Sequence, residues 1–89
     1  MGSILTVGSM YYVYILYSES KQKFYTGITS DVKRRMKEHN NGYEKSTKNG
    51  VPWVLLHAEN FRTRLEAREK EKFFKSGWGR ELRQQFLKK

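Results

Sequence analysis

Residues 11–17 read Tyr-Tyr-Val-Tyr-Ile-Leu-Tyr, an almost continuously apolar run that is rich in aromatic and β-branched side chains. Such a run is typical of a central β-strand that is covered on both faces. A polar turn at residues 18–23 separates it from a second short apolar stretch at residues 24–28. Two strands joined by so short a turn predict a hairpin.

Downstream of the hairpin, the pattern changes to the period of a helix. A helix is expected from Ser30 or Asp31 to His39, with a small polar residue as its cap and with Val32 and Met36 turned inward. Residues after this helix, from 40 to 52, contain two glycines and a proline and predict a loop. A third strand is expected to follow the loop, at residues 53–59.

The last third of the chain is expected to be helical. Residues 63–66, Thr-Arg-Leu-Glu, match a capping box, so a long helix is expected from there to about Ser76. Gly77 and Gly79 are expected to break it, and residues 81–88 to form a last short helix. The order β-β-α-β-α-α indicates an α/β (α+β) protein with a three-stranded, mainly antiparallel sheet flanked by helices.

Length and composition limit the classes of function. Residues 10–89 are expected to form one domain, and residues 1–9 to be a leader or an expression remnant. The chain has no Cys, which excludes disulfides, thiolate zinc sites and Cys nucleophiles and fits a cytoplasmic location. A core this small leaves no room for a separate targeting module, so the core or a partner protein has to supply specificity.

The charge balance points to a polyanionic partner. Eighteen Lys and Arg residues against nine Asp and Glu residues give a net charge of +9. A positive field of this size attracts polyanions, so nucleic acid is the leading partner and an anionic membrane surface the runner-up. No membrane partner is expected, because the apolar run at residues 11–17 is too short to cross a bilayer and no expected helix has a wide apolar face opposite a basic one.

The hairpin brings two tyrosines together. If its turn is centred on residues 20–21, Tyr14 lies opposite Gly27, and Leu16 lies opposite Tyr25. Tyr14 and Tyr25 then project from the same face as diagonal neighbours, with an open space beside the Tyr14 ring at Gly27. The alternative is that both tyrosines are core aromatics whose hydroxyls reach the surface.

One carboxylate interrupts an apolar stripe on the long helix. Glu71 shares a face with Ala67, Phe74 and Trp78 at helical spacing. A lone carboxylate in such a place is costly unless it is paired or binds a metal ion. The alternatives are a solvated edge of the stripe and a salt bridge to a nearby lysine.

Several basic residues suit contacts with phosphate. Arg35 and His39 share a face of the first helix, and an arginine can hold a phosphate in a fork. Arg34 on the same helix and Lys45 and Lys48 in the loop are expected to contact the nucleic-acid backbone. For any single arginine of the helix the alternative is an ordinary solvated face. The commoner catalytic patterns are absent: the chain has two histidines, no glycine-rich phosphate loop and no nucleophile elbow.

Several segments resemble, in order, the GIY-YIG nuclease superfamily. They are Tyr-Val-Tyr at 12–14, Tyr-Thr-Gly at 25–27, residues 28–40, Pro-Trp at 52–53, and the helical pattern Ala67-x-x-x-Glu71-x-x-x-Lys75. The resemblance extends from residue 11 to about Trp78 and is closest to small stand-alone bacterial members, which are similar to an N-terminal domain found in the bacterial excinuclease ABC complex. It departs at Tyr12, which stands where the first name-giving glycine would be.

The resemblance implies the GIY-YIG endonuclease fold and a role for each matching residue. Tyr14 and Tyr25 match the motif tyrosines, Arg35 matches the helix arginine, and Glu71 matches the metal-binding glutamate. His39 is similar to a frequent active-site histidine. The implied activity is hydrolysis of phosphodiesters with Mg²⁺ or Mn²⁺, in structured or damaged DNA rather than RNA.

The resemblance also raises the question of the base. Tyr14, helped by Tyr25 or His39, would position or deprotonate the attacking water. A free phenol has a pKa of about 10, so a basic Tyr14 needs nearby cations. The candidates are the metal ion itself and Lys23, which is a further expected nucleic-acid contact. One alternative function is a nucleic-acid-binding module with this fold and little or no catalysis. Another is an interaction domain whose basic surface meets an acidic protein.

Overall fold

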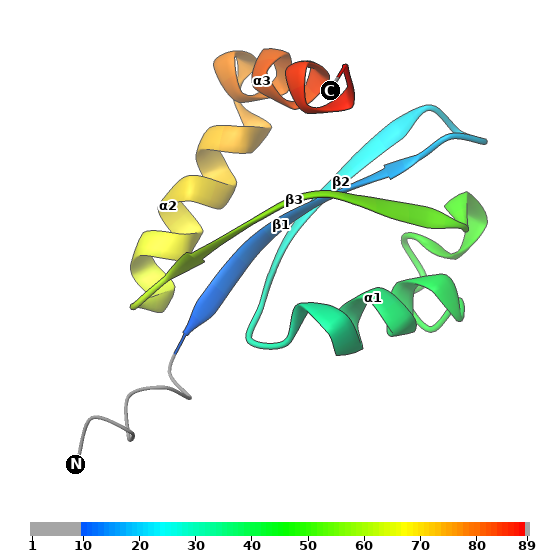
Figure 1. Ribbon diagram of the computed structural model, residues 1–89, viewed down its shortest axis with the longest axis horizontal. Helices are drawn as coiled ribbons and strands as arrows, with labels where there is room; N and C mark the ends of the chain where they lie inside the picture. The colour runs from blue at the N-terminus through cyan, green and yellow to red at the C-terminus, as the bar shows by residue number, and fades with distance from the viewer. Residues whose placement is uncertain (1–9, 89) are drawn as a thin grey trace.

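The computed structural model describes residues 10–88, so the leader expected at residues 1–9 lies outside the described residues. Its elements are β1 (Tyr11–Ser18), β2 (Lys23–Thr29), α1 (Val32–Asn40), a short 3-10 helix η2 (Lys48–Gly50), β3 (Trp53–Phe61), α2 (Arg64–Lys75) and α3 (Gly77–Leu87) (Figure 1). The three strands form one antiparallel sheet. The predicted element order and sheet are confirmed.

The central strand is β1, because the strand order is β2-β1-β3. Tyr14 pairs with Gly27 and Leu16 pairs with Tyr25, so the register predicted from the turn is confirmed. Residues 13–16 are all buried, as expected for a strand that is covered on both faces.

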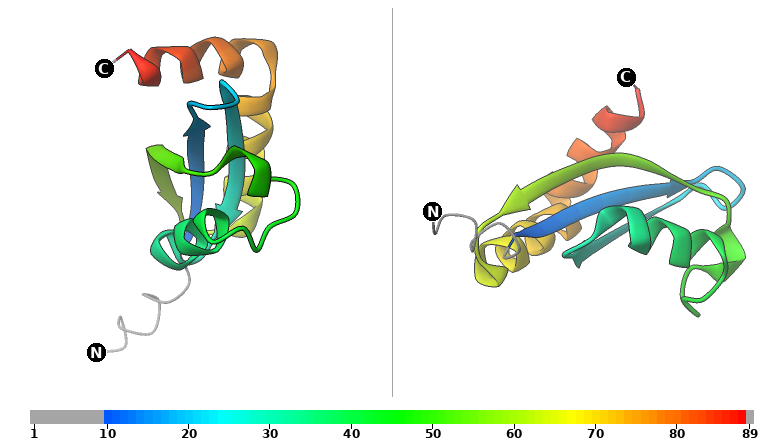
Figure 2. Two further views of the ribbon diagram at one scale, coloured as in Figure 1. Left: turned by 90° about the vertical axis from the view of Figure 1, so that its right-hand side faces the viewer. Right: turned by 60° about the horizontal axis from the view of Figure 1, so that its bottom comes forward.

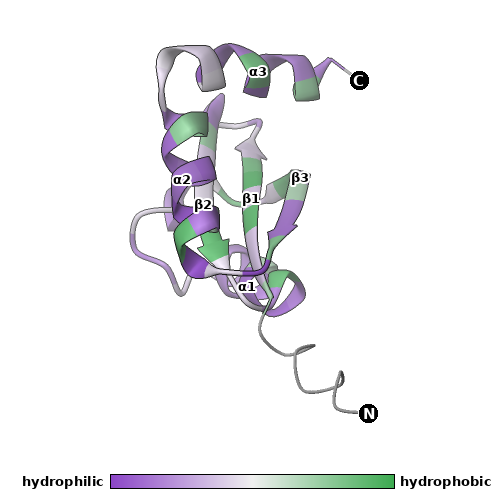
Figure 3. Ribbon diagram, turned by 90° about the vertical axis from the view of Figure 1, so that its left-hand side faces the viewer, coloured by the Kyte–Doolittle hydropathy of each residue, from purple (hydrophilic) through white to green (hydrophobic). Residues whose placement is uncertain are grey.

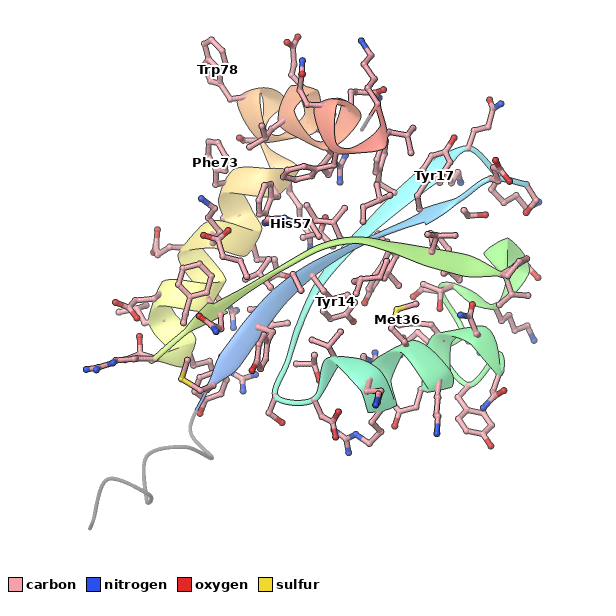
Figure 4. All side chains as sticks on the ribbon, viewed as in Figure 1. Tyr14, Tyr17, Met36, His57, Phe73 and Trp78 are labelled. Atoms are coloured by element: carbon pink, nitrogen blue, oxygen red, sulfur yellow. The ribbon has the colours of Figure 1, made fainter. Side chains whose placement is uncertain are left out.

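The two faces of β1 pack against different helices. Val13 and Ile15 belong to a core cluster with side chains of α2 and α3, whereas Tyr14 and Leu16 pack with Met36 of α1. Figure 4 shows Tyr14 and Met36 on the side of the sheet that faces α1. Helices α1 and α3 lie on opposite sides of the sheet (Figure 2). Alternate residues of one strand therefore serve two separate packing layers.

Side chains cap the helices where the sequence predicted. The Asp31 carboxylate accepts from the Arg34 N–H at the start of α1, at 3.1 Å. At the start of α2, the Thr63 hydroxyl accepts from the Glu66 N–H at 3.1 Å, and the Thr63 N–H donates to the Glu66 carboxylate at 3.3 Å. The predicted capping box is confirmed.

The prediction that the last helix starts at residue 81 is wrong. Helix α3 begins at Gly77, because the Ser76 hydroxyl caps it by accepting from the Gly79 N–H at 3.4 Å. Gly79 also allows the tight junction of the two helices, since an added Cβ there would collide with the backbone at the end of α2. Trp78 therefore belongs to α3, points outward and is 81% exposed (Figure 4), so it does not continue the apolar stripe of α2.

The loop between α1 and β3 contains η2 and is anchored to β3. The Asn40 side chain accepts from the Trp53 N–H at 2.6 Å and donates to the Trp53 carbonyl at 3.2 Å. The Trp53 indole N–H donates to the Thr47 carbonyl at 2.7 Å, which fixes the middle of the loop. Among residues 10–88, none of the helices is both long and apolar enough for a membrane span.

Candidate active site

A cleft of about 490 Å³ opens along β2, one of the two edge strands of the sheet. It is lined by Tyr14, Tyr25, Gly27, Ile28, Arg35, Arg64, Arg68, Glu71, Lys72 and Lys75. Figure 3 shows α2 running alongside β2, so side chains of α2 can reach the cleft at the sheet edge. Glu71 thus lines the same cleft as Tyr14, although α2 packs on the other face of β1.

Tyr14 and Tyr25 form the sheet side of the cleft. Their ring centroids are 6.1 Å apart, and Tyr14 is only 1% exposed, so its ring lies at the floor. The open space expected beside Gly27 is not there, because the Tyr14 ring fills it: a Cβ on Gly27 would lie 2.7 Å from the Tyr14 Oη. The missing side chain of Gly27 is what allows the phenol to reach this position.

His39 lies buried beneath the floor of the cleft. Its Nε2 is 3.0 Å from the Tyr14 Oη, and its Nδ1 is 2.8 Å from the Thr47 Oγ1. Since the Thr47 hydroxyl donates to the Glu44 carbonyl at 3.4 Å, its oxygen is left to accept from the Nδ1–H of His39. The Nε2 lone pair then accepts from the Tyr14 hydroxyl. Burial, assisted by the charge of Arg35, lowers the pKa of His39 below 6.5, which keeps the ring neutral at pH 7.

Arg35 lines the cleft between two carboxylates. Its Nη1 donates to Glu38 at 2.8 Å and its Nη2 donates to Glu44 at 2.7 Å. The hydrogen bonds to Glu44 and Glu38 raise the pKa of Arg35, so its charge is permanent. Burial raises the pKa of Tyr14 to about 12, with Tyr25 acting in the same direction and Arg35 opposing them.

Glu71 is paired with Lys75, whose Nζ lies 3.1 Å from its carboxylate. The sequence left a salt bridge to a nearby lysine as an alternative to metal binding by Glu71, and this salt bridge is present. In the described part of the chain, no three His, Asp or Glu side chains gather into a metal cage. Mg²⁺ usually keeps several waters and binds through one or two carboxylates and substrate phosphates. Glu71, partly exposed in a cleft, suits such a hydrated ion as a single protein ligand.

The four residues expected to contact the nucleic-acid backbone lie outside this cleft. Lys23, Arg34, Lys45 and Lys48 are exposed, and none of them lines it. Among the cations near Tyr14, Arg35 is the one that lowers the pKa of its phenol. A role of Lys23 beside that phenol stays a prediction. Contact of these four residues with nucleic acid stays a prediction.

Other residues of the cleft were missed in the sequence. Arg64, Arg68 and Lys72 of α2 line it, and their i, i+4, i+8 spacing was the available signal for one basic face. Thr47 and Glu44, which hold His39 and Arg35, gave no such signal, since only the folded loop brings them near α1. With these residues the cleft is strongly basic around one carboxylate.

This geometry agrees with a comparison with known families. The family described as the GIY-YIG catalytic domain matches residues 10–83. The chain therefore belongs to the GIY-YIG family, as the resemblance predicted, and the class implies nuclease chemistry, a nucleic-acid substrate and the use of a divalent metal ion.

More specifically, the relatives are small UPF0213 proteins from archaea and bacteria. The chain is 45% identical to a UPF0213 protein of Haloquadratum walsbyi over 84% of this chain and 83% of that protein. It is 43% identical to one of Streptococcus agalactiae, over 72% and 73%. The solution NMR structure of the UPF0213 protein BH0048 from Bacillus halodurans is similar as well, with a TM-score of 0.51, 36% identity, and coverage of 82% of this chain and 80% of that one.

Proposed function

We propose that this protein is an endonuclease that hydrolyses phosphodiester bonds of structured or damaged DNA, in the cytoplasm, with Mg²⁺ or Mn²⁺. The observation that carries the proposal is the single cleft in which Tyr14, Tyr25, Arg35 and Glu71 meet. These residues come from a hairpin and two helices far apart in the chain. Their excess of cationic neighbours suits a substrate with a phosphate backbone.

Glu71 is the residue that would hold the metal ion. A divalent ion bound there supplies a Lewis acid that stabilises charge on the leaving oxygen. The Lys75 ammonium, 3.1 Å from the carboxylate, holds the place of a cation in the present structure and would have to move aside. Lys75 is about half exposed, so it can do so into solvent and contact phosphate instead.

Arg35 is placed to bind a phosphate oxygen and to balance charge in the transition state. Two of its N–H groups are occupied by Glu38 and Glu44. A guanidinium has five N–H donors, so donors remain for the substrate. Because both carboxylates fix its orientation, Arg35 is held in place before substrate arrives.

Tyr14 and His39 supply a route for the proton of the attacking water. A phenol whose pKa is about 12 is protonated at pH 7, so Tyr14 cannot act as a free anion. In the proposed step, water attacks phosphorus and gives its proton to the Tyr14 oxygen. Tyr14 passes its own proton to the Nε2 of neutral His39, 3.0 Å away. The P–O ester bond breaks, and the departing oxygen takes a proton from solvent.

The test is a metal-dependent cleavage assay of Glu71→Gln beside Glu69→Gln. Both substitutions remove one carboxylate charge from α2, but Glu69 is exposed and lies outside the cleft. Branched, flapped and linear DNA and RNA are incubated with Mg²⁺ or Mn²⁺. We expect Glu71→Gln to lose cleavage by on the order of 100-fold or more and Glu69→Gln to retain it. Cleavage by Glu71→Gln at the rate of the unaltered protein would reject the mechanism.

A second candidate is a nucleic-acid-binding module with the same fold and little or no catalysis. The observation in its favour is the Glu71–Lys75 pair, which satisfies the carboxylate without a metal ion. It predicts salt-sensitive binding of DNA or RNA with no metal-dependent turnover on any substrate in the same assay. A protein partner that supplies specificity is compatible with either candidate.

A further inference from the structure

A second hollow, of about 260 Å³, lies next to the cleft. It lies between the end of the β1–β2 hairpin and the loop that contains η2, and it is lined by Lys21, Lys23, Phe24, Tyr25, Ser46, Thr47, Asn49, Gly50 and Trp53. Tyr25 lines both this hollow and the cleft, so the two are neighbours across one ring.

Strand β2 runs from one hollow to the other. Alternate residues of a strand point to the same face. Gly27, Tyr25 and Lys23 therefore lie in a row on one face of β2. Gly27 lines the cleft only, Tyr25 lines both, and Lys23 lines the second hollow only. At about 3.3 Å of rise per residue, Lys23 lies roughly 13 Å along the strand from Gly27. That distance equals the length of about four base steps along the axis of a DNA double helix, at 3.4 Å each.

The charges of the second hollow are uncompensated. Its lining includes two lysines and no Asp or Glu. Within residues 10–88, Lys21 and Lys23 take part in none of the ion pairs, unlike Arg35 and Lys75 in the cleft. Two free ammonium groups beside polar side chains such as that of Asn49 suit the phosphates of a nucleic-acid strand in helical form rather than an apolar ligand.

We propose that this hollow is a subsite for the nucleic-acid strand that is cut in the cleft. Lys21 and Lys23 contact phosphates about four nucleotides from the scissile bond, and the exposed edge of Tyr25 separates the two positions. This inference rests on the proposed function, because the cleft defines the scissile position. It gives the cleft a direction: the substrate strand follows β2 toward the hairpin turn.

The test measures binding of a fluorescein-labelled branched DNA without divalent metal, as a function of salt. Lys21→Ala/Lys23→Ala is compared with Arg80→Ala/Lys88→Ala, which removes the same charge from α3 and its C-cap, away from both hollows. All four side chains are exposed, so both variants should fold. We expect the first variant to bind about tenfold more weakly and the slope of log Kd against log salt to fall by about 2, with a much smaller change for the control.

A methylphosphonate scan along the cleaved strand locates the contact. A neutral linkage about four nucleotides from the cleavage site should weaken binding by the unaltered protein but not by Lys21→Ala/Lys23→Ala. Equal losses in the two variants, or the same methylphosphonate profile in both proteins, would overturn the subsite. Cleavage by the unaltered protein combined with unchanged binding by Lys21→Ala/Lys23→Ala rejects the subsite and leaves the nuclease. The expected binding loss without cleavage of any substrate rejects the nuclease and leaves the binding site.

Discussion

The two faces of β1 differ in chemistry although they belong to one strand. On the α2 face, Val13 and Ile15 pack with Ala67 and Phe74, and the polar side chains nearest to them are Thr26, His57 and Arg83, of which Arg83 donates to the Thr26 hydroxyl. On the α1 face, Tyr14 shares its surroundings with buried His39 and Thr47, and the charged Arg35 lies beside it.

The difference shows which layer of the protein is free to do chemistry. An apolar cluster gains stability from removal of apolar surface from water, and it needs no partner groups. Buried polar groups gain little net stability, even when each one is hydrogen-bonded. The chain of hydrogen bonds from Tyr14 through His39 to Thr47 therefore stabilises the fold less than apolar side chains in the same place would. We infer that the polar residues of this layer serve the cleft rather than the stability of the fold.

The largest effect on stability is expected on the α2 face. Phe74 is 1% exposed and belongs to the cluster of Val13 and Ile15. Phe74→Ala should lower the free energy of unfolding by about 3–5 kcal/mol, measured by urea denaturation, because it leaves a cavity. Phe74→Leu, with a smaller loss, provides a measurable variant if the alanine variant does not fold. The control Trp78→Ala alters an exposed aromatic and should change stability by less than about 0.5 kcal/mol. Similar losses for Phe74→Leu and Trp78→Ala would contradict the layer assignment.

The pattern of this strand was predictable, while the support of its polar face was not. A continuous apolar run predicts burial on both faces, and the position of the turn was enough to pair Tyr14 with Gly27. The identity of Thr47 as the partner of His39 depends on how a 13-residue stretch, residues 40–52, folds back onto α1, and no local pattern encodes that. Pairing of Glu44 with Arg35 has the same origin.

In the last third of the chain, too, local signals predicted the helices but not how they pack. The capping box at Thr63 is a local signal and was read correctly. Gly77 and Gly79 are also local signals, and they predict a break in the helix. In the structure they form the first turn of α3, because Ser76 caps that helix and Gly79 allows the backbones of the two helices to approach closely. Glu71 was found as an interruption of the apolar stripe. That it reaches round the sheet edge to the cleft follows from the placement of α2 beside β2, which the sequence does not contain.

A smaller effect on stability but a large effect on activity is expected at Tyr14. Tyr14→Phe removes the hydroxyl that faces His39 and leaves one buried nitrogen without its partner, which should cost about 1–2 kcal/mol of unfolding free energy. The proposed proton route should meanwhile lose about 100-fold or more in cleavage rate under single-turnover conditions. Tyr17→Phe on the same strand removes a hydroxyl outside the cleft and should change neither quantity appreciably. Full activity of Tyr14→Phe would remove the phenol from the proton route.

The smallest effect is expected at Glu44, where stability should depend on pH. The hydrogen bond from Arg35 lowers the pKa of the Glu44 carboxyl in the folded protein. Its contribution to stability is therefore complete at neutral pH, above the unfolded pKa of about 4.3, and is lost as the pH falls through the lowered folded value.

Glu44→Gln keeps the shape of the side chain but removes the charge, so it should cost about 1 kcal/mol at pH 7 for a partly exposed ion pair. The stability difference from the unaltered protein should shrink toward zero as the medium becomes strongly acidic, which urea denaturation at a series of pH values can follow. Glu19→Gln, at an exposed turn position outside the ion pairs of residues 10–88, is the matched control and should give no difference at any pH. A cost of Glu44→Gln that stayed constant down to acid pH would mean that the side chain acts through its shape. The ion pair between Glu44 and Arg35 would then contribute less to the stability of the α1 face than the contact implies.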